Sequence, residues 1–303
     1  MNKNTIIAIL VMLLWASCYP LIVLSAPYAS PMLTAFFRAI FAGIFLIIIA
    51  LVFARPFPKL LTDWLYIIGI GLTATTIGFW GMFYAGTLVS PGLATVLTNT
   101  QPIIAGVLGW YFLKERINFR SLIAILLGFT GIVIISLDSL ASDNEQLLSG
   151  IFYISVAAFG IAISNLLLKK LANQVDILYA MGFQLFIGGI PLGVISVNQN
   201  DILVPQWGYT YIWILSVLAI LGTALPFILW FWLMDKAPLY KLNVFSFLTP
   251  VFGLSIGMMY FSESLSAIQW IGVLAIALSI YFVTKTEPIK GSTIEYDDIH
   301  SDF

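Results

Sequence analysis

Long apolar runs separated by short polar connections make up most of this chain. A helix needs roughly 20 apolar residues to cross the hydrocarbon core of a bilayer, and ten of the runs reach about that length. They are Thr5–Leu24, Pro31–Phe53, Trp64–Tyr84, Leu93–Leu113, Ser121–Leu137, Ser149–Leu168, Ile177–Val197, Tyr209–Met234, Leu242–Phe261 and Ala267–Val283. Because the connections are short, neighbouring helices should pack antiparallel. The pattern predicts an all-α integral membrane protein with ten transmembrane helices.

The fourth run combines a polar stripe with a proline. One helix face carries, at i, i+3, i+4 and i+7 spacing, Thr95, Thr98, Asn99 and Pro102. A proline inside a helix leaves the carbonyl four residues earlier without its amide partner, and here that carbonyl belongs to Thr98. We therefore predict a helix that bends at Pro102 and exposes polar backbone at mid-membrane depth.

The same arrangement recurs at a constant offset of 148 residues. Pro102 becomes Pro250, and the residue four positions before the second proline is Ser246. The offset also pairs Thr95 with Asn243, Gly109 with Gly257, Glu115 with Glu263 and Thr75 with Thr223. In the first two helices of each half the offset is 146, which pairs Phe37 with Phe183 and Gly43 with Gly189. A five-helix unit is therefore expected to occur twice.

An odd number of spans makes the second unit enter the membrane from the opposite side. We predict two inverted five-helix repeats, residues 1–140 and 141–285, followed by a polar cytoplasmic tail, residues 286–303. Inverted repeats are typical of secondary transporters, in which a site between the halves opens to either side. Similar composition alone makes apolar helices resemble one another, but it does not align Pro, Gly and Glu at one offset.

Composition and charge support this map. Of the 303 residues 61% are hydrophobic and only 9% charged, which is more apolar surface than a soluble domain can bury. All Lys and Arg residues except Arg38 fall on one side of the ten-span map, whereas the connections on the other side carry acids: Asp138, Asp143, Glu145, Asp201 and Glu263. By the positive-inside rule both termini are expected to be cytoplasmic.

Other chemistries find little support in the sequence. The single cysteine, Cys18, excludes an internal disulfide, and the single histidine, His300, lies in the polar tail, so we expect no metal site and no cofactor. A membrane protease would need a catalytic base or a pair of aspartates within the membrane, and the aspartates nearest to the runs lie at their ends. No basic block indicates a nucleic-acid partner. We expect a protein that is not an enzyme.

Four segments resemble EamA-type bacterial permeases of the drug/metabolite transporter superfamily. They are MLLWASCYPLI and LTAFFRAIFAG in the first two helices, and QPIIAGVLGWYFLKERI and TPVFGLSIGMMYFSESL in the two proline helices. The resemblance extends over nearly the whole chain, from Thr5 to Val283. It implies a multi-pass protein of the bacterial inner membrane that moves small metabolites, including amino acids and drugs.

In that family, helices one, three, four, six, eight and nine line a central cavity. The resemblance therefore implies a binding site where the fourth and ninth helices cross. Its expected polar residues are Thr95, Thr98, Asn99, Gln101, Asn243, Ser246 and Thr249, and its expected walls are Trp15, Trp80 and Trp230. The alternative for the aromatic residues is an interfacial belt or packing against lipid. Pro102 and Pro250 are the candidate hinges; the alternative is that they only shape packing.

Three charged residues are further candidates. Arg38 lies within a span, about 10 Å from its outer end, and no carboxylate lies at that depth. It is expected to contact substrate, water or a backbone carbonyl, or to fix helix packing. Glu115 and Glu263 end the fourth and ninth helices. We expect them to stabilise the start of the helix that follows, with Asn118 and Ser266 as caps; the alternative is a gating pair.

The sequence thus predicts a secondary transporter of a small organic solute, an exporter that works by alternating access in the bilayer. Its pocket, uncharged except for Arg38, suits a neutral, zwitterionic or amphiphilic solute. No Asp, Glu or His lies mid-span, so we expect no carboxylate-based proton relay. The alternatives are a membrane channel or a membrane scaffold without transport activity.

Overall fold

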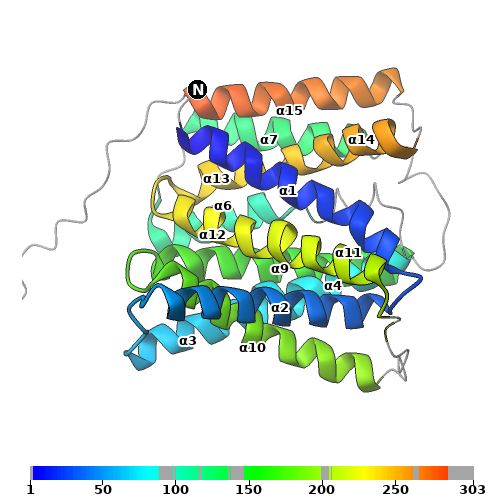
Figure 1. Ribbon diagram of the computed structural model, residues 1–303. Coiled ribbons are helices and arrows are strands. Elements are labelled where there is room, and N and C mark those ends of the chain that lie inside the picture. Colours follow the sequence, from blue (N-terminus) through cyan, green and yellow to red (C-terminus); the bar gives the residue numbers. More distant parts are fainter. Residues whose placement is uncertain are drawn as a thin grey trace, which may run out of the picture.

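The computed structural model describes residues 3–88, 98, 100–115, 118–135, 137, 147–198, 205, 207–261 and 266–285, which fold as helices and short connections (Figure 1). The first half contains α1 (Lys3–Ser25), α2 (Pro31–Val52), α3 (Leu61–Ile70), the π-helix η1 (Gly71–Ile77), α4 (Gly78–Leu88), α6 (Gln101–Leu113) and α7 (Phe119–Ile135). The second contains α9 (Leu147–Leu171), α10 (Ile177–Asn198), α11 (Tyr209–Ala219), the π-helix η2 (Ile220–Ala224), α12 (Leu225–Met234), α13 (Leu239–Phe245), α14 (Leu248–Phe261) and α15 (Ala267–Lys285).

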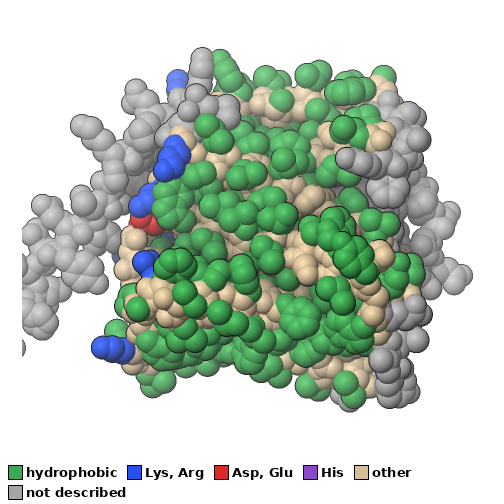
Figure 2. Space-filling model, in the orientation of Figure 1, with side chains coloured by type: hydrophobic (Ala, Val, Ile, Leu, Met, Phe, Trp, Pro, Cys, Tyr) green, Lys and Arg blue, Asp and Glu red, His purple; other side chains and the backbone are tan. Residues whose placement is uncertain are grey.

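Within these residues, six helices are long and apolar enough to cross a membrane: Lys3–Ile22, Pro31–Val52, Leu61–Ala85, Leu148–Leu171, Ile177–Val197 and Tyr209–Met234. Shorter apolar helices cover Gln101–Leu113, Phe119–Ile135 and Ala267–Phe282. Figure 2 shows a hydrophobic face between the two ends of the helices, with Lys and Arg side chains gathered at the end where Figure 1 marks the N-terminus. The surface carries large apolar side chains that are more than half exposed, such as Leu51, Val107 and Trp213. This is expected for a surface that faces lipid.

Side-chain caps start several helices where the sequence places Ser, Asn or Pro. Ser30 accepts a hydrogen bond from Leu33 N, and Pro31 occupies the first turn of α2. Asn118 Oδ1 accepts from Ser121 N at 2.8 Å. Ser266 and Gln269 bond each other's backbone amides as a capping box. The expected caps at Asn118 and Ser266 are confirmed.

Glycines let pairs of helices approach closely. α2 packs along α10, and a Cβ added to Gly43 would lie 2.7 Å from Phe186 N and 2.8 Å from Gly182 O. α7 packs along α15 through Gly131 and Gly272, where a Cβ on either residue would lie 2.6 or 2.5 Å from the other's carbonyl. Backbone contact of this kind is typical of small residues in membrane helix interfaces. Each pair joins an early segment of the chain to a late one.

Two predicted spans are continuous but contain a π-helix. The predicted Trp64–Tyr84 span contains η1, and the predicted Tyr209–Met234 span contains η2. In η2, Thr223 Oγ1 donates to Leu218 O, five residues back, at 2.8 Å. Each π-helix holds one of the threonines that the 148-residue offset pairs, Thr75 and Thr223. Single π turns inside α-helices are frequent at functional sites.

The structure corrects the prediction of proline kinks within continuous helices. α6 begins at Gln101, with Pro102 in its first turn, where proline is tolerated because the missing N–H has no partner there. The predicted Leu242–Phe261 span instead consists of α13 and α14, interrupted at Ser246 and Phe247, and Pro250 lies in the first turn of α14. Proline therefore marks where a helix restarts.

The carbonyl expected to be exposed before Pro250 is also paired. Ser246 O accepts from Thr249 N at 3.0 Å, because the interruption is a tight turn with bonds three residues apart. Phe247, at this turn, is fully buried against Gly128, which has no side chain to displace its ring. The turn is thus held by packing as well as by the proline.

Candidate functional site

A cluster of buried amide side chains lies at the interruption between α13 and α14. Asn243 Oδ1 accepts two hydrogen bonds, from Gln101 Nε2 at 2.8 Å and from Asn165 Nδ2 at 3.2 Å. Asn243 Nδ2 donates to Leu239 O at 2.9 Å. All three amides are at least 92% buried, so their mutual bonds compensate the loss of water. We call Gln101, Asn165, Asn243 and Trp230 the amide cluster.

Indole rings complete one side of the amide cluster. Trp230 Nε1 donates to Asn165 Oδ1 at 3.0 Å, and the Trp230 ring lies 5.5 Å from that of Trp15 and is tilted against it. Phe227 contacts Trp15 edge-on. The structure therefore brings together four of the predicted residues, Trp15, Gln101, Trp230 and Asn243, from helices α1, α6, α12 and α13.

Asn165 is the functional candidate that the sequence analysis missed. It lies in α9 within an apolar run, one helical turn before Lys169, and is 3% exposed. Its Nδ2 and Oδ1 atoms link Asn243 to Trp230, so it holds the two sides of the cluster together. The signal that was available is a single asparagine inside a predicted span, because a polar group in hydrocarbon is costly without a partner.

Two of the remaining predicted polar residues flank the cluster. Ser246 Oγ donates to Asn243 O at 2.6 Å, and Thr249 Oγ1 donates to Met12 Sδ at 3.4 Å. Thr98 is half-buried in a helical position. Thr95, Asn99 and the Glu263 carboxylate lie outside the described residues, so their predicted roles stay predictions.

Trp80 belongs to a neighbouring aromatic group. Its ring lies 5.0 Å from Tyr153 in α9 and 5.8 Å from Tyr84, and Tyr84 stacks on Tyr153 at 5.2 Å. This group packs with Phe79 and Phe83 beside Phe227, which in turn contacts Trp15. The predicted wall is thus divided between the amide cluster and an aromatic group on the side of the predicted outer helix ends.

Arg38 bridges helices from both halves. It is 5% exposed; its Nε donates to Thr223 Oγ1 at 2.6 Å and its Nη2 to Gly222 O at 3.1 Å, both in η2. The guanidinium also lies 4.9 Å from the centre of the Phe79 ring. Within the described residues no carboxylate pairs with it. Of the partners considered from the sequence, the backbone carbonyl is the one that the structure shows, and it favours a role in helix packing.

A neutral counterpart of this bridge lies in the other half. Gln184 is 146 residues after Arg38, and its Oε1 accepts from Thr75 Oγ1 at 2.9 Å in η1. Thr75 and Thr223 are themselves related by the 148-residue offset. Each half therefore inserts one long polar side chain, at the same place in its second helix, against the π-helix of the other half.

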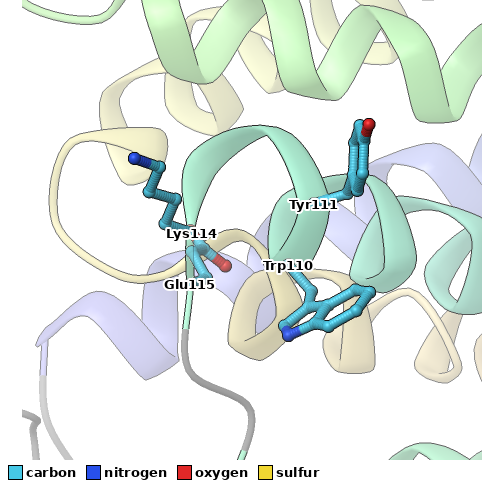
Figure 3. Close-up of a pocket in the computed structure, with 4 residues that line it drawn as sticks. All are labelled: Trp110, Tyr111, Lys114 and Glu115. Carbon is cyan, nitrogen blue, oxygen red and sulfur yellow. The ribbon is translucent and has the colours of Figure 1, made fainter.

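Glu115 has a different partner from the predicted one. Its Oε1 accepts from Leu239 N at 2.9 Å and its Oε2 from Tyr240 N at 3.5 Å, so it caps α13, not the following helix α7. The sequence could not show this contact because 124 residues separate Glu115 from Leu239. Figure 3 shows Glu115 with Trp110, Tyr111 and Lys114 around a surface depression of about 340 Å³ at the end of α6, with Lys114 and Glu115 on different sides of the chain.

Taken together, a polytopic α-helical protein carries a buried, uncharged hydrogen-bonding cluster where an interrupted helix meets four others. Side-chain amides of this kind can give up the hydrogen bonds between them and bond a polar solute instead, at little net cost in free energy. They supply no nucleophile or titratable group for chemistry. The amide cluster is therefore the candidate binding site.

Comparison with known proteins agrees with this class. Residues 3–137 and 148–285 each match the EamA-like transporter family, so the chain belongs to that family, as its motifs predicted. An uncharacterized transporter of Synechocystis sp. is 30% identical over 290 residues, covering 90% of this chain and 86% of the relative. A WAT1-related chloroplastic protein of Arabidopsis thaliana is 29% identical over 269 residues, covering 86% of this chain and 64% of the relative.

Two further proteins are similar over almost their full lengths. A probable amino-acid metabolite efflux pump of Salmonella typhimurium is 25% identical, covering 96% of this chain and 99% of the relative. A solved crystal structure is similar with a TM-score of 0.76 at 16% identity, covering 93% of this chain and 96% of that one. The structural similarity concerns the fold alone.

Proposed function

We propose that this protein is a secondary transporter that exports a small organic solute by alternating access, with the amide cluster as part of its binding site. The observation that carries the proposal is the link across the two halves: Gln101 of α6 bonds Asn243 of α13 beside the interruption of the ninth predicted span. Such a link can be replaced by a solute and re-formed after its release.

The proposed architecture is ten spans in two inverted five-helix repeats, residues 1–140 and 141–285. Contacts that recur between the halves support it. α9 packs on η1 and α4, as α1 packs on η2 and α12; α9 packs on α6, as α1 packs on α14. The Arg38–Thr223 and Gln184–Thr75 bonds recur in the same way. A pseudo-two-fold axis in the membrane plane produces such paired contacts.

The proposed solute is neutral or zwitterionic, such as an amino acid, a related metabolite or a drug-like molecule. The cluster offers amide groups and the faces of Trp15 and Trp230, and its described members carry no charge. The Salmonella relative, named for amino-acid metabolite efflux, favours this class and the export direction. The proposed setting is a bacterial inner membrane with both termini in the cytoplasm.

The first experiment finds the solute. Purified protein in detergent is screened for thermal stabilisation across a library of amino acids and other metabolites. A solute that raises the melting temperature is then tested for uptake into proteoliposomes, with protein-free liposomes as the control. We expect saturable uptake of at least one stabilising solute. Stabilisation without uptake would contradict transport and favour a scaffold that binds the solute.

A further inference from the structure

The start of α13 is held by a carboxylate from the other half of the molecule. Glu115 follows α6, and its two oxygens accept the backbone amides of Leu239 and Tyr240, the first two residues of α13. Both amides belong to the first turn of a helix, where N–H groups have no partner within the helix. A bond between an ionised carboxylate and such an amide is stronger than one between neutral groups.

The end of α6 is shaped to present this carboxylate. Lys114 adopts the left-handed backbone conformation, φ 54° and ψ 28°, and the amides of Lys114 and Glu115 both donate to Gly109 O. This is a left-handed turn at a helix C-terminus, with lysine in the position that usually holds glycine. It turns the chain so that the Glu115 side chain lies against Gly109, where a Cβ would be 3.3 Å from Oε2.

A lysine from the same half as α13 contacts the connection that precedes this helix. Lys169 of α9 donates to Met234 O and, at 2.7 Å, to Ala237 O. Lys169 therefore fixes this connection within the second half. Glu115 joins the start of α13 to the first half, so this contact must break if α13 moves away from α6.

Leu239 connects this contact directly to the amide cluster. Its N–H donates to Glu115, and its C=O accepts from Asn243 Nδ2 one turn later. A solute that bonds Asn243 competes with the bond from Asn243 Nδ2 to Leu239 O. A shift of α13 changes both that bond and the bond from Leu239 N to Glu115. The binding site and the Glu115 contact are therefore mechanically linked through one residue.

We propose that Glu115 is a gate latch: it holds the cytoplasmic side of the site closed in this structure and releases α13 when the site opens to the cytoplasm. This inference rests on the proposed alternating-access transport. A second tie between the halves at this end, Arg55 Nε to Asp176 Oδ2 at 2.7 Å, lies between α2 and α10, which the glycine contacts hold together along their lengths. We therefore expect α2 and α10 to move together, so that the bond between Arg55 and Asp176 stays intact when the site opens.

The test measures access to the site without any solute. Thr249 is replaced by cysteine in a Cys18→Ser background, and the rate of labelling by a membrane-impermeant maleimide is measured from the cytoplasmic side in inside-out vesicles. In Glu115→Ala the rate should rise about tenfold, because hydrogen bonds to a charged group that favoured the closed form are lost. An unchanged rate would overturn the latch.

Asp235→Asn is the matched control. Asp235 is an acid of the connection before α13, but its bonds go to Lys236 and Asn173, both in the second half. The hydrogen bond from Lys236 is the main cause that lowers the pKa of Asp235, so it is a carboxylate at neutral pH and the substitution removes one charge as Glu115→Ala does. Labelling in Asp235→Asn should equal that of the parent. An increase equal to that in Glu115→Ala would overturn the latch in favour of a general charge effect.

A backbone variant tests the same bond from its other side. Leu239→Pro removes the N–H that Glu115 accepts, at a first-turn position that tolerates proline and after a residue, Pro238, that is already extended at φ −58° and ψ 146°. Leu239→Ala removes the side chain but keeps the N–H. The latch predicts faster cytoplasmic labelling in Leu239→Pro than in Leu239→Ala, both checked for monodispersity. Equal rates would contradict it, whatever the outcome for transport itself.

Discussion

Replacing Asn165 should disrupt the hydrogen bonds of the amide cluster. Asn165→Ala leaves Trp230 Nε1 without its acceptor and Asn243 with one donor fewer, and a buried unsatisfied polar group costs about 1–3 kcal/mol. We expect a folded protein whose solute-induced thermal stabilisation is lost. The matched control is Ser164→Ala: Ser164 is equally buried, but its hydroxyl donates to Ile161 O in its own helix. Equal stabilisation in both variants would remove Asn165 from the site.

Arg38 is expected to act as a packing bridge, because both its Nε and its Nη2 bond η2. The neutral Gln184 occupies the corresponding place in the other half, so Arg38→Gln should fold and keep solute exchange. Its melting temperature should fall, since a hydrogen bond to a charged group is worth about 1.5–3 kcal/mol. Full stability with abolished exchange would instead indicate that the guanidinium binds the solute.

Sequence reasoning located polar residues well where a second signal accompanied them. Gln101 directly precedes Pro102, Asn243 lies seven residues before Pro250, and the two prolines recur at one offset. The structure places Gln101 and Asn243 in hydrogen-bonding contact. Asn165 carried no such second signal, because no proline or repeat marks its run and nothing in the run shows which helix it faces. The sequence predicts that Glu115 stabilises the adjacent helix, because a sequence pattern indicates capping only between residues that are close along the chain.

At the scale of secondary structure, the interruptions of the fourth and ninth predicted spans are the features that a transport cycle would use. Pro102→Ala and Pro250→Ala each restore a backbone donor in the first turn of α6 or α14. We expect both variants to fold, since alanine favours helix, and to exchange solute slowly because a continuous helix is stabilised. Exchange is measured on purified, monodisperse protein. Wild-type rates in both variants would defeat the hinge interpretation.

The prolines indicated that the helices are interrupted, but not where. Proline is excluded from a helix interior and accepted in its first turn, so the same residue indicates either a kink or a restart. Packing of Phe247 against Gly128 selects the restart in the ninth predicted span, and that contact depends on tertiary structure. The π-helices could not be predicted from the sequence for the same reason. Threonine and glycine in η1 contact α10, those in η2 contact α2, and no local pattern indicates these contacts.

At the scale of the whole molecule, the charge distribution makes a topological prediction. A single cysteine at Ser142 should react with an impermeant reagent from outside the cell, and one at Ser292 only from the cytoplasm, both in a Cys18→Ser background. The physical reason is the placement of all Lys and Arg residues except Arg38 on one side of the ten-span map. Labelling of both positions from one side would contradict that map.

Hydropathy and charge predicted a helical membrane protein, because the composition admits no other solvent for the apolar surface. The internal offset predicted which parts of the chain resemble each other. Neither could show that α2 meets α10 and α7 meets α15, because these contacts depend on glycines whose partners are far away in the sequence. Solute identity depends on the cavity geometry that those contacts build.

Solute counterflow tests the central claim, that the two halves alternately expose one site, most directly. Proteoliposomes containing the wild-type protein are loaded with unlabelled solute from the thermal screen and diluted into a trace of the labelled solute. If the protein is a carrier, labelled solute should accumulate faster in loaded vesicles than in empty ones, and only transiently. The reason is that unlabelled solute inside the vesicle binds the inward-facing site and speeds its return to the outer face. A labelled-solute flux that is the same in loaded and empty vesicles would indicate a pore and contradict alternating access.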